Sequence, residues 1–70
     1  MNNETKKLLL KKLIDKDLHS FSSLAKAIDI SPAVLSRKLN GHTDFTREEI
    51  KDIKQCLSLT AEEVCNIFLN

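Results

Sequence analysis

Glycine, proline and aromatic residues are scarce in this sequence. Its 70 residues include one Gly, one Pro, three Phe and neither Trp nor Tyr. Gly and Pro mark turns and interrupt helices, so their scarcity, with a hydrophobic content of 41%, favours one all-helical domain over residues 1–70. No run of 18 apolar residues occurs, which excludes a membrane-spanning helix. No small-residue cleavage site follows residues 1–10, so we expect no signal peptide and a cytoplasmic protein.

The groupings of residues that carry chemistry are also missing. Cys56 and Cys65 have no histidine cluster beside them, so we expect no zinc site and two reduced, buried thiols. No carboxylate pair, Ser/His/Asp set or glycine-rich loop is spaced for catalysis, which argues against an enzyme and implies no cofactor. His19 and His42 are expected in surface loops, and a phosphate contact is the functional alternative for His42.

Residues 24–41, LAKAIDISPAVLSRKLNG, have the pattern of two short helices joined by a tight turn. Leu24 and Ile28 are four residues apart and predict the buried stripe of the first helix. Ser31 is a strong N-cap for the second helix, and Pro32 suits its first position because the missing N–H costs nothing there.

The second helix is predicted to bury one face and expose the other. Leu35 and Leu39, four residues apart, form the buried face. Asn40 and Gly41 end the helix, and Gly41 is free to adopt the left-handed conformation. The side chains that point outward are those of Ala33, Ser36, Arg37 and Asn40. A helix presented in this way is the DNA-reading element of helix-turn-helix proteins.

The sequence resembles the Cro-type helix-turn-helix family of phage and bacterial regulators, whose pattern runs approximately LAxxLGIS-x-LSxxLNG. The matching residues are Leu24, Ala25, Ile28, Ile30, Ser31, Leu35, Ser36, Leu39, Asn40 and Gly41. The likeness continues through Phe45 and Thr46 to Phe68 and is strongest to short single-domain phage Cro repressors. It implies a five-helix, lambda-repressor-like fold and a double-stranded DNA operator as partner.

Two positions depart from the family pattern. Asp29 replaces the turn glycine, and Asp tolerates the left-handed region better than most residues, so we expect the turn to be kept. Phe21 opens the first helix of the motif, where the family usually has a polar residue that meets a phosphate. That phosphate contact is therefore not carried over to Phe21.

Three further helices are predicted around the motif. The first covers residues 3–15, with Leu9, Leu10, Leu13 and Ile14 as its buried stripe. The other two follow capping boxes, Thr46 with Glu49 and Thr60 with Glu63. Each of these two starts is also marked by a hydrophobic staple, as is the start at Ser31. The staple pairs are Phe45–Ile50, Leu59–Val64 and Ile30–Leu35.

Charge is unevenly distributed along a chain whose net charge is only +1. Residues 1–42 hold eight basic and four acidic residues, a net charge of +4, whereas residues 43–70 hold three basic and six acidic residues, a net charge of −3. The basic part contains the motif, as a phosphate-facing surface would. The lysines of the first helix are equally consistent with an ordinary solvated face.

The outward face of the second motif helix combines apolar and polar residues. Its leading residues, Pro32 to Val34, cannot donate a side-chain hydrogen bond to a base and could only contact a thymine methyl group. Arg37 could bind guanine through two hydrogen bonds, whereas Asn40 is better explained as a helix-end residue beside Gly41 than as a base contact. The predicted DNA- or partner-binding residues are Ser22, Ser23, Lys26, Ser31, Pro32, Ala33, Val34, Ser36, Arg37, Lys38 and Asn40.

Two functions remain open from the sequence. The first is a regulator of a phage lysis/lysogeny switch that binds operator DNA through residues 32–39. The second is an antirepressor, or modulator of repression, that binds a phage repressor protein through the apolar Ala33 and Val34, with Arg37 at the rim. Residues 64–69 are apolar on more than one side; they either close a small core or form part of a homodimer face.

Overall fold

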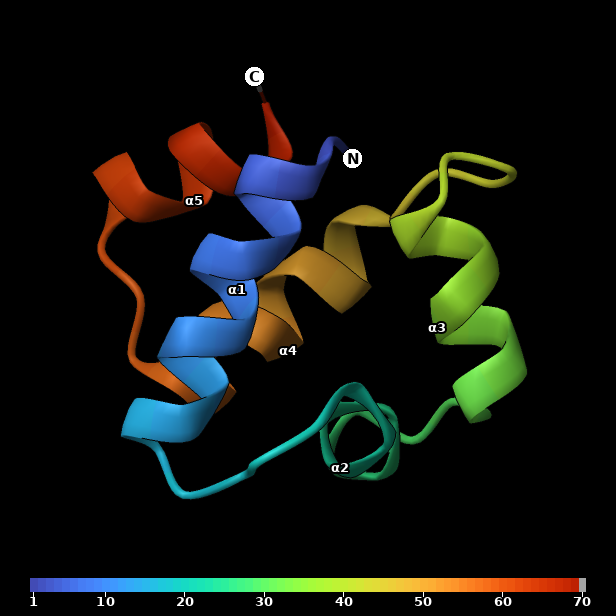
Figure 1. Ribbon diagram of the computed structural model, residues 1–70. Helices are drawn as coiled ribbons and strands as arrows, with labels where there is room; N and C mark the ends of the chain where they lie inside the picture. Colours follow the sequence, from blue (N-terminus) through green and yellow to red (C-terminus); the bar gives the residue numbers. More distant parts are fainter. Residues whose placement is uncertain (70) are drawn as a thin grey trace.

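Each helix begins at a polar side chain that caps its first turn, and the caps predicted from the sequence at Ser31, Thr46 and Thr60 are confirmed. The computed structural model describes residues 1–69 and contains α1 (Asn3–Asp15), α2 (Phe21–Ala27), α3 (Pro32–Leu39), α4 (Arg47–Leu57) and α5 (Ala61–Phe68) (Figure 1). The caps are Asn2, Ser20, Ser31, Thr46 and Thr60. Both predicted capping boxes are present, because each Thr hydroxyl accepts from the glutamate N–H and each glutamate accepts from the Thr N–H.

The turn between α2 and α3 keeps its shape without glycine. Asp29 has a φ of 62°, in the left-handed region. The Ile30 N–H donates to the Ala25 carbonyl at 2.9 Å and the Asp29 N–H donates to the Lys26 carbonyl at 3.3 Å, which together form a Schellman motif. Gly41, with a φ of 82°, ends α3 in the same way. The expectation that Asp29 would preserve the turn is therefore confirmed.

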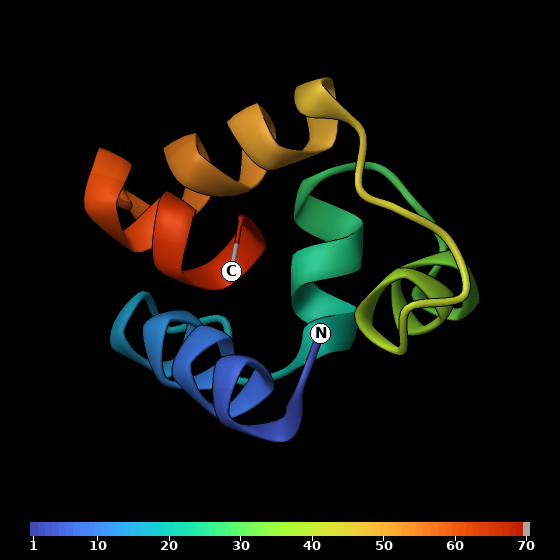
Figure 2. The ribbon, with the colours of Figure 1, turned by 90° about the horizontal axis from the view of Figure 1, so that it is seen from above.

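One hydrophobic core joins all five helices (Figures 1 and 2). The helix α1 lies beside α5, and α2 crosses the middle of the molecule against α3, while α4 packs on α5. The buried apolar side chains are Leu9, Leu13, Leu24, Ala25, Ile28, Leu35, Leu39, Ile53, Leu57, Leu59 and Ile67. This arrangement leaves α3 at one side of the molecule, held mainly through α2.

Four of the side chains predicted to be buried are less buried in the structure, and the mildest case is Leu10, which is half-buried. Ile14 is 54% exposed because the buried line of α1 runs through Leu9 and Leu13, and the next residue along the helix turns away from it. Cys65 is exposed and Cys56 only half-buried, so the prediction of two buried thiols is wrong. Cys65 lies on the side of α5 opposite the buried line through Ile67. The helices described for residues 1–69 are all too short or too polar to span a lipid bilayer.

Candidate nucleic-acid interface

The helix α3 is anchored by two leucines and open on its other side. Leu35 is 1% exposed and Leu39 is 5% exposed, so both lie in the core. The Ser31 hydroxyl accepts from the Val34 N–H at 3.1 Å and fixes the start of the helix. Consequently the exposed residues of α3 share one outward surface, and they are Pro32, Ala33, Val34, Ser36 and Arg37.

Arg37 places a cation on this surface. Its side chain is exposed, and among residues 1–69 no carboxylate lies within ion-pair distance of its guanidinium. An arginine in this state can form two hydrogen bonds with a guanine or a phosphate without first breaking an internal contact. The geometry is thus compatible with the role that the sequence predicts for Arg37.

The predicted residues of α2 divide into exposed and partly occupied side chains. Ser22 and Lys26 are exposed. Ser23 is half-buried, and its hydroxyl lies 3.2 Å from that of Ser20, the cap of the same helix. Phe21, where the family pattern has a polar residue, packs against the core from its half-buried position.

Asn40, at the end of α3, is contacted by a residue that the sequence did not single out. The Lys6 ammonium donates to the side-chain Oδ1 of Asn40 at 2.7 Å, and the side-chain Nδ2 of Asn40 donates to the Ser36 hydroxyl at 3.5 Å. Lys6, Ser36 and Asn40 line a groove between α1, α2 and α3 together with Phe21. The pattern of α1 places Lys6 off the buried stripe, but it gives no sign of a contact with α3.

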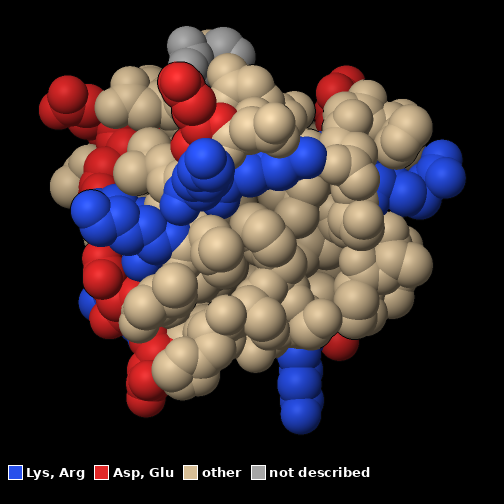
Figure 3. All heavy atoms as spheres, in the orientation of Figure 1, with Lys and Arg blue, Asp and Glu red and all other residues tan. Residues whose placement is uncertain are grey.

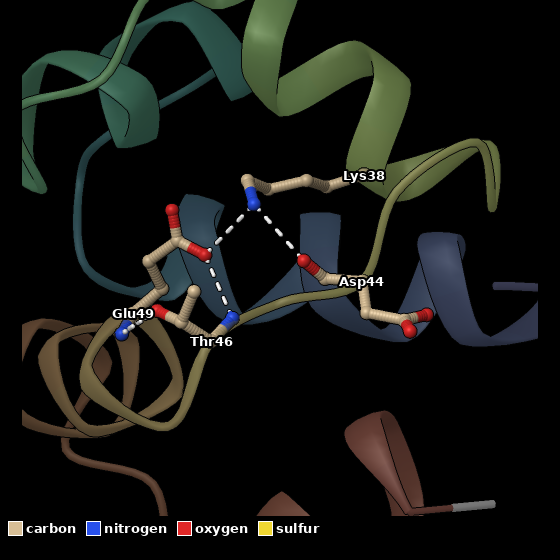
Figure 4. Close-up of polar contacts among 4 residues, drawn as sticks. All are labelled: Lys38, Asp44, Thr46 and Glu49. Carbon is tan, nitrogen blue, oxygen red and sulfur yellow. Dashed lines mark hydrogen bonds and ion pairs between the residues drawn. The ribbon is translucent and has the colours of Figure 1, made fainter.

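Lys38 differs from the expectation that it lies on or beside the exposed face. Its side chain is only 10% exposed, and its ammonium points back toward the start of α4 (Figure 4). There it lies 3.0 Å from Oε1 of Glu49 and donates to the Asp44 carbonyl at 2.9 Å. Lys38 follows Arg37 on the helix, so a rotation of one residue takes its side chain from the open surface to the α4 side.

The Glu49 carboxylate balances opposing influences. Burial acts to raise its pKa, but the Thr46 N–H and the Lys38 ammonium outweigh burial and hold the pKa below its ordinary value. Glu49 is therefore ionised at neutral pH, and it is the direct counter-charge of Lys38. This ion pair is more enclosed than the pair between Lys12 and Glu63, whose side chains are 30% and 26% exposed.

Charged side chains are unevenly placed over the molecule. In the view of Figure 3, basic side chains gather over α1, acidic ones follow the edge beside α5, and a wide uncharged area occupies the middle. A polyanion approaching α3 and the first turns of α1 would meet more positive than negative charge. No group of three His, Cys, Asp or Glu residues capable of holding a metal ion occurs among residues 1–69.

The helix-turn-helix geometry agrees with a family model that matches residues 8–68, described as the Cro/C1-type HTH DNA-binding domain. The chain belongs to this family. In this Cro/C1-type domain, α2 and α3 are the two helices of the motif, and the predicted resemblance and all-helical fold are confirmed. Comparisons with curated proteins and with solved structures found no match. The family membership supports DNA as the partner and transcription regulation as the general role.

Proposed function

We propose that this Cro/C1-type domain is a phage-type transcriptional regulator that binds operator DNA through α3. The observation that carries the proposal is the placement of Arg37, exposed beside Ser36 on a helix whose opposite side is fixed in the core by Leu35 and Leu39. A rigid helix that exposes a cation and a hydroxyl fits the major groove of DNA. The family resemblance further favours a lysis/lysogeny switch as the setting.

The contacts would divide by chemistry along the motif. Arg37 and Ser36 would bind base edges, while Ala33 and Val34 would contact thymine methyl groups. Lys26, exposed on α2, would neutralise a phosphate, which positions the domain without reading the sequence. Specificity would therefore depend on few polar contacts, and mismatches opposite Arg37 would cost most.

The test is a titration of DNA from the protein's own promoter region, followed by fluorescence anisotropy at several salt concentrations. We expect log affinity to fall linearly with log salt, with a slope of about −0.9 for each phosphate that is neutralised. Arg37→Ala should weaken binding, whereas Lys54→Ala, a loss of the same charge from an exposed site on α4, should not. Absence of binding at low salt would overturn the proposal.

A second function is favoured by the apolar start of α3. Val34 is 41% exposed, and Pro32 and Ala33 beside it are also exposed. A surface that cannot donate hydrogen bonds to bases suits the core of a protein interface. On this alternative the domain is an antirepressor that covers the DNA-reading surface of a phage repressor protein.

Val34→Glu separates the two functions because Val34 is outside the core. Near DNA the new carboxylate repels phosphates, so operator binding should weaken. In a protein interface the same carboxylate is desolvated without a partner, so the complex with the neighbouring repressor should fail. Both assays are run on the native protein and the variant. Loss of a repressor complex by a protein that never bound DNA would favour the antirepressor.

Pairing of two copies is a further part of the proposal. Ile67 is buried and Phe68 half-buried, whereas Leu69 is 71% exposed at the end of α5. This exposed leucine could add apolar area to a two-fold contact between α5 helices. Sedimentation of the native protein and of Leu69→Ser would test the contact, and a native protein that remains monomeric would contradict it.

A further inference from the structure

Lys38 connects three consecutive parts of the chain at one point. Its backbone belongs to α3, its ammonium donates to the Asp44 carbonyl in the following loop, and the same ammonium pairs with Glu49 in the first turn of α4 (Figure 4). The Glu49 oxygen that receives Lys38 also accepts the Thr46 N–H at 2.8 Å. The cap of α4 and the end of α3 therefore share one carboxylate oxygen.

Other connections between α3 and α4 are limited. The backbone of α3 lies alongside α2, and its approach to α4 is much less extensive (Figure 2). In the intervening loop, the N–H groups of Gly41 and His42 bond only to α3 itself, and the ring of Phe45 packs edge-on against Phe68 of α5. The polar tie through Lys38 is thus the direct charged link from the outward helix to α4 within residues 1–69.

We propose that Lys38 and Glu49 are positioning residues for DNA binding: their ion pair fixes the end of α3 that carries Arg37 and Asn40, and Lys38 itself contacts no phosphate. The inference rests on the proposed function of α3. Its physical basis is that a side chain nine-tenths buried against a counter-charge is oriented far more firmly than an exposed lysine. The adjacent Arg37 is held on the same turn of helix, so its direction follows that of the anchored backbone.

A positioning role for the ion pair reverses the effect that Glu49→Gln is expected to have on DNA affinity. Glu49→Gln removes a negative charge near DNA, which by electrostatics alone should strengthen binding. Gln still accepts the Thr46 N–H, so the capping box can be kept. However, the enclosed Lys38 ammonium loses its counter-charge and is driven toward water. If the ion pair positions α3, the variant therefore binds DNA more weakly despite its more favourable charge.

The experiment measures operator binding of Glu49→Gln and Lys38→Met at several salt concentrations, at a temperature where circular dichroism shows each variant folded. The matched controls are Glu63→Gln and Lys12→Met, because this pair also joins a lysine to a capping-box glutamate but lies between α1 and α5. We expect roughly fivefold weaker binding for each α3–α4 variant, an unchanged salt slope, and no comparable loss in the controls. Lys38→Arg, which can still pair with Glu49, should bind DNA as tightly as the native protein.

Three results in the DNA measurements would overturn the positioning role of Lys38 and Glu49. One is tighter binding by Glu49→Gln with a steeper salt slope, which would mean that a freed Lys38 binds phosphate. The second is a salt slope that becomes shallower by about 0.9 in Lys38→Met, as expected for loss of one phosphate contact in the native protein. The third is an equal loss in the matched controls, which would show a general effect on the fold.

A measurement without DNA distinguishes failure of this inference from failure of the proposed function. Amide hydrogen exchange of Thr46, whose N–H is bonded to Glu49, should accelerate in Lys38→Met, and exchange of Thr60 should not. Unchanged exchange at Thr46 would overturn the positioning role even if the native protein binds its operator. If exchange of Thr46 accelerates in Lys38→Met but the native protein binds no DNA, the Lys38–Glu49 connection between α3 and α4 is supported. The proposed DNA binding by α3 is then contradicted.

Discussion

The two capping boxes of this domain are alike in sequence and differ in what they connect. Thr46 with Glu49 opens α4, and Thr60 with Glu63 opens α5, each with reciprocal hydrogen bonds near 3 Å. In each box the glutamate also pairs with a lysine from another helix. In both boxes, the glutamate that caps a helix therefore also binds a side chain from a helix elsewhere in the chain.

The two boxes differ in how the lysine meets the glutamate and in which helices the ion pair joins. Lys38 and Thr46 share one oxygen of Glu49, whereas Lys12 uses the oxygen of Glu63 that the cap leaves free. The first pair is more enclosed and joins the outward helix α3 to α4; the second is more exposed and joins α1 to α5. Similar motifs are thus expected to contribute unequally to stability, according to the burial of the ion pair.

The largest expected effect is in the apolar anchor of α3, the helix that the first box connects to α4. Leu35→Ala should lower the free energy of unfolding by about 2–5 kcal/mol, because it removes a side chain that is 1% exposed and leaves a cavity. In a small, marginally stable domain this should largely unfold the chain. Thermal and urea unfolding measure the loss, with Ile14→Ala, at a 54% exposed position, as the control. Similar losses in both variants would contradict the assigned core.

The next effect compares the two lysines directly. Lys38→Met should reduce the free energy of unfolding by about 1–3 kcal/mol, because the enclosed Glu49 carboxylate loses its charged partner. Lys12→Met should cost less, since both of its paired side chains are more exposed and water screens them. Urea unfolding at neutral pH gives the two values. A larger loss of unfolding free energy in Lys12→Met than in Lys38→Met would contradict the stated difference between the two boxes.

The smallest effect is in the acid dependence of stability. The Thr46 N–H and Lys38 outweigh burial to lower the pKa of Glu49, and Lys12, with Thr60, lowers the pKa of Glu63. A lowered pKa in the folded state means that the unfolded chain binds the proton first, so this stability is full above the ordinary glutamate pKa and is lost as pH falls through the folded value. Unfolding measured across this range should show a shallower acid loss in Lys38→Met than in the native protein. An identical pH dependence would contradict the role of Lys38 in setting that pKa.

Several features of the fold were predictable because they depend on neighbours in sequence. A cap joins residues three positions apart, so Ser31, Thr46 and Thr60 could be assigned without knowledge of the tertiary structure. The left-handed positions at Asp29 and Gly41 follow from the same local reasoning. Together with the spacing of apolar residues, which predicted α1 and the buried side of α3, these signals located the helices, while the DNA-binding role of the individual residues stays a prediction.

The predictions that failed concern side chains near the edge of a buried stripe. Ile14 and Cys65 are apolar or weakly polar, and the helical pattern alone could not show that no neighbouring helix covers them. Lys38 was grouped with Arg37 because the two are adjacent on α3. The structure separates them, since the position of α4 offers a carboxylate to one and leaves the other facing outward.

Short-range spacing along the chain was enough to predict where the helices begin and end, which side of α3 is buried, and the family to which the motif belongs. Which basic residues remain available for a partner depends instead on how the helices pack. Lys38 is neutralised by Glu49 and Lys6 is held by Asn40, whereas Arg37 stays open. The physical reason is that a long charged side chain pairs with whatever lies within its reach, and that neighbour is fixed only when the helices pack.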